Sequence, residues 1–200
     1  MKKVVKLAAL GAALTIAGGV QAADPVRIGA VVSQTGPAAF LGEPAAITLK
    51  HYVEKLNEDG GLLGRPVELV LYDDASDANT ARTYATRLVE DDEVSAVIGT
   101  STTGATLAMI SVFEDAEVPL VSLAAGIQII EPVNPYVFKT PHTDRMVCER
   151  VMIEFSERSF DQVALMTGTG GVGKSVRKEC TEQAEKRGIE IIADETFNPK

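Results

Sequence analysis

The stretch VRIGAVVSQTGPAAFLG, residues 26–42, joins an apolar run to the start of an amphipathic segment. Residues 26–32 are almost entirely apolar and rich in β-branched side chains, which predicts a strand buried on both faces. The loop over 33–42 leads into a predicted helix with Pro44 near its first turn and Gly60-Gly61 after its end. A buried strand followed by a helix is the repeating unit of parallel α/β folds.

The same unit recurs along the rest of the chain. Apolar runs predict further strands over residues 67–73, 95–99, 119–123, 162–167 and 189–194. Amphipathic stretches predict helices over residues 79–91, about 104–116, about 144–158 and about 173–187. This strict alternation predicts an α/β protein with parallel sheets and right-handed crossovers.

The alternation stops at EPVNPYVFKTPHTD, residues 131–144, which contains three prolines and no helical period. We interpret residues 132–143 as a crossover between two doubly wound lobes, the first over 23–141 and the second over 142–200. The second lobe has only two predicted strands, too few for a doubly wound sheet with its own core. We therefore expect an N-terminal part of a longer protein, or a lobe that a partner completes.

The first 22 residues have the three-part build of a secretory signal peptide. Lysines precede an apolar stretch from Leu7 to Val20, and small residues then predict cleavage between Ala22 and Ala23. A membrane anchor is the alternative, but the apolar stretch is shorter than the ~20 residues that a span requires. We expect an exported protein that is not inserted in the membrane after cleavage.

Charge excludes some partners. The chain has a formal net charge of -9, and three of its lysines lie in the predicted signal peptide. An acidic surface repels nucleic acid and anionic membranes. We expect no nucleic-acid partner.

The two cysteines each lie on an apolar helical stripe. Cys148 shares its stripe with Val151 and Met152, and Cys180 shares one with Val176 and Ala184. Both cysteines are therefore predicted to face a core, where free thiols are common. A Cys148–Cys180 disulfide is the alternative in an oxidising compartment, and we favour the free thiols.

A run of hydroxyl residues suggests a binding site. The third predicted strand ends at Gly99, and Thr100 to Thr103 follow before a helix that starts near Gly104. In open α/β sheets ligands bind outside the carboxyl ends of the strands, and the amides of a helix start attract anions. Helix capping explains one of these hydroxyls well. We expect Thr102, Thr103 and Gly104 to bind a carboxylate, with capping as the alternative.

Several motifs together resemble a known family. They are VRIGAVVSQTGPAAFLG, then LNEDGGLLGRPVELVLYDDASDANTARTYATRLVEDDEVSAVIGTSTTGATLAM, EVPLVSLAAG and YVFKTPHTD. The chain resembles the periplasmic solute-binding proteins of ABC importers of the leucine/isoleucine/valine-binding type. The resemblance covers essentially the whole mature chain, and members are about twice as long. It implies two lobes that close on a solute.

The resemblance also implies site residues. Thr103, Ala124 and Gly126 fall where the family binds the ligand carboxylate. Phe40 falls where an aromatic often covers the ligand, and a lid residue or a loop anchor is the alternative. Gly126 departs from the hydroxyl residue usual there, and Val172 replaces a usual tyrosine. Both changes make the pocket more apolar, so we expect a hydrophobic amino acid or an aromatic carboxylate as solute.

Residues 168–175, GTGGVGKS, match the phosphate-binding P-loop pattern and follow a predicted strand. The resemblance gives Gly173 another reason to be present, and ATP is not normally available outside the cytoplasm. We interpret the match as a coincidence. Catalytic residues, cofactors and metal-ligand spacings are not predicted.

Three functions from different classes remain. We favour a solute receptor that delivers its ligand to the membrane permease of an ABC importer. An exported sensory module of the same fold is the alternative. A nucleotide hydrolase using Lys174 is the least favoured.

Overall fold

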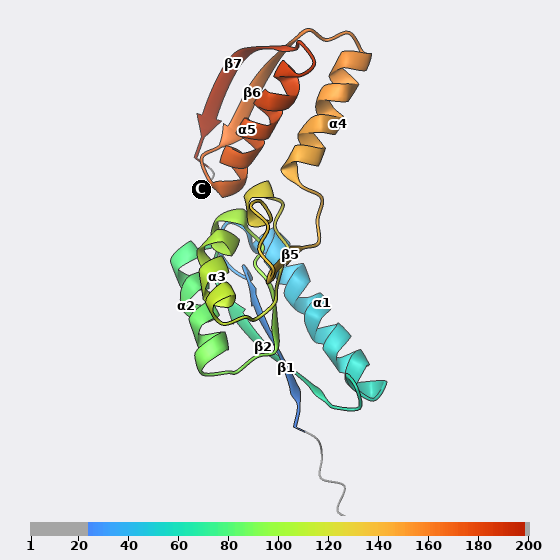
Figure 1. Cartoon of the computed structure of the whole chain (residues 1–200), viewed down its shortest axis with the longest axis vertical. Coiled ribbons are helices and arrows are strands. Elements are labelled where there is room, and N and C mark those ends of the chain that lie inside the picture. Colours follow the sequence, from blue (N-terminus) through green and yellow to red (C-terminus); the bar gives the residue numbers. More distant parts are fainter. Residues whose placement is uncertain (1–23, 199–200) are drawn as a thin grey trace, which may run out of the picture.

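The computed structural model describes residues 24–198, which form two parallel β-sheets flanked by helices (Figure 1). The predicted signal peptide and its cleavage site at Ala22 and Ala23 lie outside the described residues. The strands are β1 (Val26–Val32), β2 (Val67–Asp73), β3 (Ala96–Gly99), β4 (Leu120–Ser122), β5 (Val137–Lys139), β6 (Gln162–Gly168) and β7 (Glu190–Phe197). The helices are α1 (Ala39–Glu58), α2 (Ala78–Glu90), α3 (Thr103–Asp115), the 3₁₀ helix η1 (Ile127–Ile129), α4 (Asp144–Glu157) and α5 (Gly171–Glu185).

Strands β1 to β5 form one parallel sheet in the order β2-β1-β3-β4-β5. Helix α1 covers one face of this sheet, and α2 and α3 cover the other (Figure 1). Its core includes the fully buried side chains of Leu88, Met109 and Phe113. The prediction of a doubly wound parallel α/β fold is confirmed. We call β1–β5 with α1–α3 and η1 the first sheet unit.

Local side chains fix where three helices begin. Asp77 precedes α2, Thr102 precedes α3 and Thr143 precedes α4, and each side chain accepts a hydrogen bond from the amide three residues later. The donor–acceptor distances are 2.8–3.3 Å. Such caps satisfy amides that have no acceptor within the helix, so these boundaries follow from the sequence.

The prediction for the start of the first helix is wrong. Helix α1 begins at Ala39, so Pro44 lies inside it instead of near its first turn. The early start brings Gly42 onto the end of β1, where an added Cβ would lie 2.1 Å from the carbonyl oxygen of Ser33. Proline has no backbone amide hydrogen, so the helix lacks one hydrogen bond at Pro44. Because Pro44 is the sixth helical residue, this loss falls near the N-terminal end, and the helix continues to Glu58.

The crossover is also shorter than predicted. Residues 137–139 form β5, which pairs in parallel with β4 through Leu120↔Val137 and Ser122↔Lys139. A three-residue strand between prolines has too little periodicity to be recognised in the sequence. Only residues 140–143 separate β5 from α4. The division into lobes at residues 141 and 142 stays a prediction.

Strands β6 and β7 form the second sheet, which packs with α4 and α5 around a small core. We call these four elements the second sheet unit. Cys148 of α4 and Cys180 of α5 form a disulfide with a Cα–Cα distance of 4.7 Å. The expectation of free thiols is wrong. The apolar stripes of the two helices do face a core, as predicted, but both face the same one. The two cysteines therefore meet where α4 packs on α5.

Candidate functional site

Five of the predicted site residues lie together at the carboxyl ends of β3 and β4. Thr102 caps α3, Thr103 and Gly104 begin it, and Ala124 and Gly126 follow β4. The amide of Gly126 donates a hydrogen bond to Thr103 Oγ1 at 3.2 Å, which joins the two segments directly. Parallel strands place this edge where ligands bind in open α/β sheets.

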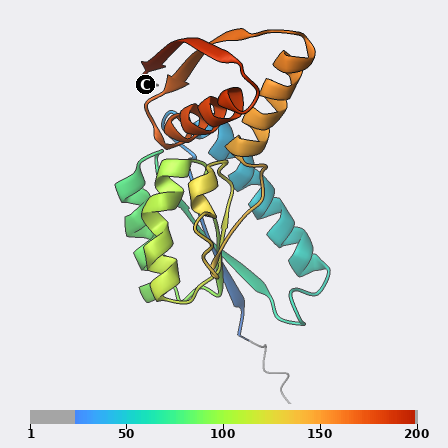
Figure 2. The ribbon, with the colours of Figure 1, turned by 45° about the horizontal axis from the view of Figure 1, so that its top comes forward.

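The second sheet unit contacts the same edge. A Cβ added to Gly171, the first residue of α5, would lie 2.9 Å from the amide nitrogen of Gly104. Figures 1 and 2 both show α5 beside the end of the first sheet unit. Val172 follows Gly171 and is 47% exposed. The close approach of α5 to α3 was not predicted, because it depends on how the two units pack.

Phe40 comes from a different strand end, that of β1, which neighbours β3 in the sheet. It belongs to the first turn of α1, which sits at the carboxyl end of β1. Its side chain is 74% exposed. A role for Phe40 over a bound solute stays a prediction.

The side-chain hydroxyls of residues 100–103 all accept hydrogen bonds from nearby backbone amides. Helix capping was expected to explain only one of the four. Thr102 is the cap of α3, so the other three find acceptor roles elsewhere in the first sheet unit. Thr100 accepts from the Thr102 amide, and Ser101 accepts from the Ser33 amide, both at 3.2 Å. Thr102 accepts from the Ala105 amide at 3.3 Å, and Thr103 accepts from the Gly126 amide at 3.2 Å. Each hydroxyl keeps its own proton to donate, and carboxylate binding by Thr102 and Thr103 stays a prediction.

Gly126 packs tightly against the side chain of Thr103. A Cβ added to Gly126 would lie 2.3 Å from Thr103 Cγ2, so a larger residue requires Thr103 to move. We expect Gly126→Ser to lower the free energy of unfolding by about 1–3 kcal/mol through overpacking. Thr103→Ser removes the clashing methyl group and should relieve most of that loss. Urea unfolding of the two single variants and the double variant tests this, and additive losses would contradict it.

Two helix starts meet at this site. The amides of the first helical turn have no acceptor within the helix, and the helix dipole makes this end positive. Thr103 and Gly104 belong to the first turn of α3, and Gly171 begins α5, whose N-cap Gly170 has no capping side chain. The site is therefore electrostatically suited to an anionic group such as a carboxylate.

The P-loop match does not form a phosphate-binding loop. A P-loop holds phosphates with converging backbone amides. Here β6 ends at Gly168 and α5 begins at Gly171, and the Lys174 amide donates to the carbonyl of Gly170 at 3.0 Å. A Cβ on Gly173 would lie 1.9 Å from the carbonyl oxygen of Gly168, and Ser175 is buried. The motif is thus a tight turn and a regular helix.

An ionic cluster that the sequence did not predict lies beside the crossover. Arg145 Nε donates to Glu179 Oε2 at 2.7 Å, while its two terminal nitrogens donate to the two carboxylate oxygens of Glu131 at 2.9 Å. The Glu179 side chain is fully buried. Hydrogen bonds from Arg145 lower the pKa of Glu179 below its usual range, and bonds from Glu179 and Glu131 raise the pKa of Arg145.

Asp144 anchors the start of α4 to the first sheet unit. Its amide donates to the carbonyl of Ala125 at 3.2 Å, and its Oδ1 accepts from the amide of Ile127 at 3.0 Å. Lys139 Nζ also donates to the carbonyl of Ala125 at 3.0 Å. Burial lowers the pKa of Lys139, and the Asp144 carboxylate opposes that effect. These contacts hold the backbone on either side of Gly126.

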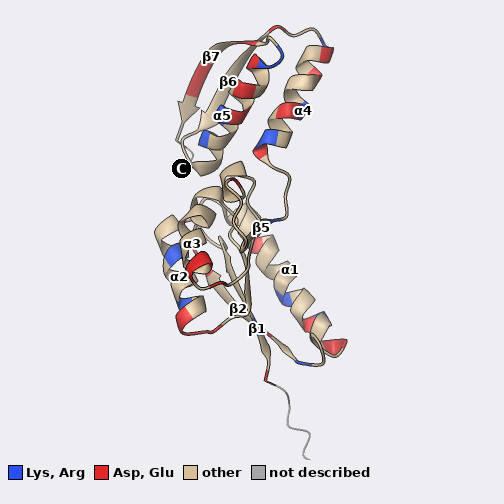
Figure 3. Ribbon diagram, viewed as in Figure 1, with Lys and Arg blue, Asp and Glu red and all other residues tan. Residues whose placement is uncertain are grey.

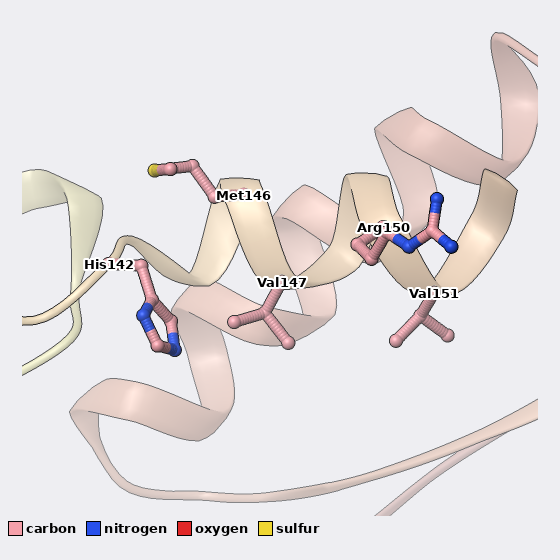
Figure 4. A pocket seen from close by; sticks show the side chains of 5 residues that line it. All are labelled: His142, Met146, Val147, Arg150 and Val151. Atoms are coloured by element: carbon pink, nitrogen blue, oxygen red, sulfur yellow. The ribbon is translucent and has the colours of Figure 1, made fainter. Parts of the chain in front are cut away.

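An apolar hollow in the described structure is lined by other residues. It measures about 380 Å³ and runs along α4, lined by His142, Met146, Val147, Arg150 and Val151. Figure 4 shows the side chain of His142, in the loop before α4, and those of Val147 and Val151 on α4 pointing to the same side. None of the predicted site residues lines it.

None of residues 24–198 belongs to a helix with the length and apolarity needed to cross a membrane. Within the same range, no group of three or more His, Cys, Asp or Glu side chains is arranged to hold a metal ion.

Comparisons with known proteins agree with this geometry. The family described as "Periplasmic binding protein" matches residues 25–200. The leucine-, isoleucine-, valine-, threonine-, and alanine-binding protein of Pseudomonas aeruginosa is 29% identical over 198 residues, which cover 96% of this chain and 53% of that protein. The chain spans about half the length of the curated relatives it matches.

Two solved structures share the fold at a TM-score of 0.79. One is the branched-chain amino acid transporter substrate binding protein LivJ of Streptococcus pneumoniae in complex with isoleucine, 29% identical, with 88% of this chain and 50% of that chain covered. The other is a solute binding protein of an ABC transporter from Rhodopseudomonas palustris BisB5 in complex with 3,4-dihydroxy benzoic acid, 26% identical, with 88% and 48% covered.

Two parallel sheet units that meet at the carboxyl ends of their strands define the two-lobed binding-protein class. The chain belongs to the periplasmic binding protein family. The resemblance inferred from the sequence motifs is confirmed.

Proposed function

We propose that this protein is the periplasmic solute receptor of an ABC importer, which binds a carboxylate-bearing solute between the two sheet units and delivers it to a membrane permease. The observation that carries the proposal is the meeting of the α3 and α5 helix starts beside Thr103, Ala124 and Gly126. The names of the related proteins support the receptor class, because they describe an amino-acid-binding protein and a transporter substrate binding protein.

The first sheet unit would supply the carboxylate contacts. Thr103 Oγ1 accepts the Gly126 amide, so the Thr103 hydroxyl proton is free to point at a ligand oxygen. The first-turn amides of α3 add donors and a favourable dipole. These groups suit any solute with a carboxylate and do not by themselves require an amino group.

We infer that the solute is a hydrophobic amino acid or an aromatic acid. Gly126 and Val172 place no hydroxyl and no tyrosine beside the carboxylate subsite, so this part of the site is more apolar than the family pattern. The two related structures contain isoleucine and 3,4-dihydroxy benzoic acid. Both ligands carry one carboxylate and a hydrocarbon part, which is an aliphatic side chain in isoleucine and a dihydroxylated aromatic ring in 3,4-dihydroxy benzoic acid.

Thermal unfolding of the full-length mature protein tests the proposal. A ligand present at 100 times its Kd stabilises the folded state by about 2.7 kcal/mol. We expect a rise in Tm of several degrees with a branched-chain amino acid or an aromatic acid, and no rise with ATP. Lys174→Ala should leave the solute effect unchanged. A Tm rise with ATP alone would refute the receptor function.

A matched pair of variants locates the site. Thr103→Val removes the hydroxyl at the α3 start, and Thr106→Val removes a buried hydroxyl one turn later that bonds to Thr102 and Ser122. We expect the solute-induced Tm rise to disappear in Thr103→Val and to persist in Thr106→Val. The opposite pattern would place the carboxylate elsewhere.

A further inference from the structure

The ionic cluster at the crossover connects the two sheet units. Glu131 lies just after η1, before β5, and therefore moves with the first sheet unit. Arg145 is the second residue of α4, and Glu179 lies in the middle of α5, so both move with the second sheet unit. In Figure 3, the end of α4 nearest the first sheet unit carries both an acidic and a basic position.

Arg145 makes two ion pairs, which we call the Glu179 arm and the Glu131 arm, and their environments differ. The Glu179 arm is fixed within the second sheet unit, because the Glu179 side chain is fully buried and lies 2.7 Å from Arg145 Nε. The Glu131 arm is two parallel bonds of 2.9 Å to a carboxylate that is 50% exposed. Paired Arg–carboxylate bonds of this kind are directional as well as strong. Only the Glu131 arm crosses between the units.

The neighbouring Asp144 determines how this arm responds to motion. Asp144 is bonded to Ala125 and Ile127 of the first sheet unit, and these two bonds hold the start of α4 against that unit. The Arg145 side chain extends away from that fixed point and is held by Glu179, so it turns with α4 and α5. A change in the angle between the units therefore changes the Arg145–Glu131 geometry.

We propose that the Glu131–Arg145 pair is a conformational latch, which favours the arrangement in which the α5 start contacts the α3 start. Breaking the pair shifts the ligand-free protein toward more open arrangements. The inference deepens the proposed function, because closure between the units is what encloses the solute.

Distance measurements on the ligand-free full-length protein test the latch. Spin labels are placed on two exposed positions, with Lys50→Cys in α1 and Lys186→Cys after α5, and pulsed EPR gives the distribution of distances. We expect Glu131→Gln to lower the ratio of closed to open populations about two- to fivefold, the range for a partly exposed ion pair. Raising the NaCl concentration should lower it in the parent protein and have little effect in Glu131→Gln.

Glu68→Gln is the matched control. Glu68 is also 50% exposed and pairs with Arg27 at 3.1 Å, but both residues lie within the first sheet unit. We expect this variant to keep the parent distribution. Equal distributions in the parent and Glu131→Gln, or equal shifts in both variants, would overturn the latch. Because no solute is present, either outcome leaves the proposed receptor function to be judged by its own thermal test.

Discussion

Replacing both cysteines by alanine should lower the free energy of unfolding of the second sheet unit by about 3–4 kcal/mol. The Cys148–Cys180 disulfide closes a loop with a sequence separation of 32 residues. Loop closure of this length removes much of the conformational freedom of the unfolded chain. Within residues 24–198, the second sheet unit has two strands and a small core, and the disulfide joins the two helices that enclose this core.

Urea unfolding of the full-length mature protein measures this effect. Cys148→Ala/Cys180→Ala should unfold at a clearly lower urea concentration than the parent. Adding a thiol reductant should bring the parent close to the variant and should leave the variant itself unchanged. If the reductant changes neither protein and both unfold at the same urea concentration, the disulfide contributes no stability.

Hydrogen exchange identifies where the loss occurs. Amides of α4 and α5 should lose protection in the double alanine variant, while those of β1 and β3 in the first sheet unit should keep theirs. The core residues Cys148, Met152 and Ala184 lie between the two helices that the disulfide joins. A uniform loss over both sheet units would show that they unfold together.

The element order could be predicted because it depends on local patterns. The apolar run at residues 26–32 and the side chains of Asp77, Thr102 and Thr143 specify a strand and three helix starts within a few residues of chain. The break in this alternation at residues 132–143 indicated two units, and the family motifs agreed with it. The start of α1 was missed, because the fit of Gly42 against Ser33 outweighed the preference of proline for a first turn.

The candidate site was predictable only in part. The hydroxyls at the end of β3 and the small residues after β4 are sequence features at two strand ends, and parallel topology brings them together. The contact of Gly171 with Gly104 depends on packing between the two units. A sequence reveals which residues follow strands, but not which distant helix start will face them.

The disulfide and the ionic cluster were missed for the same reason. Cys148 and Cys180 were both assigned to buried stripes, yet only the packing of α4 on α5 shows that the stripes face each other. Arg145 bonds to Glu131 and Glu179 over separations of 14 and 34 residues. Among many acidic residues, nothing in the sequence distinguishes these two as its partners.

Replacing Arg145 by methionine should lower the free energy of unfolding by about 3 kcal/mol at neutral pH, the lower end of the range for a buried charge that loses its partner. Glu179 is fully buried, and Lys178 Nζ at 3.6 Å is mostly exposed and can compensate only in part. Arg145→Met/Glu179→Met should recover much of the loss, because no buried charge remains.

The pH dependence separates this mechanism from a loss of packing. In the parent protein, hydrogen bonds from Arg145 lower the pKa of Glu179 in the folded state. The pair therefore stabilises the protein at pH values above the pKa that Glu179 has in the unfolded chain. This stabilisation is lost as the pH falls through the lower pKa that Glu179 has in the folded protein. In Arg145→Met, burial instead favours the neutral acid, so Glu179 destabilises the protein less as pH falls. The difference in unfolding free energy between parent and variant should therefore shrink from about pH 7 to about pH 4. A packing defect would give a difference that does not change with pH, and urea unfolding at both pH values distinguishes the two.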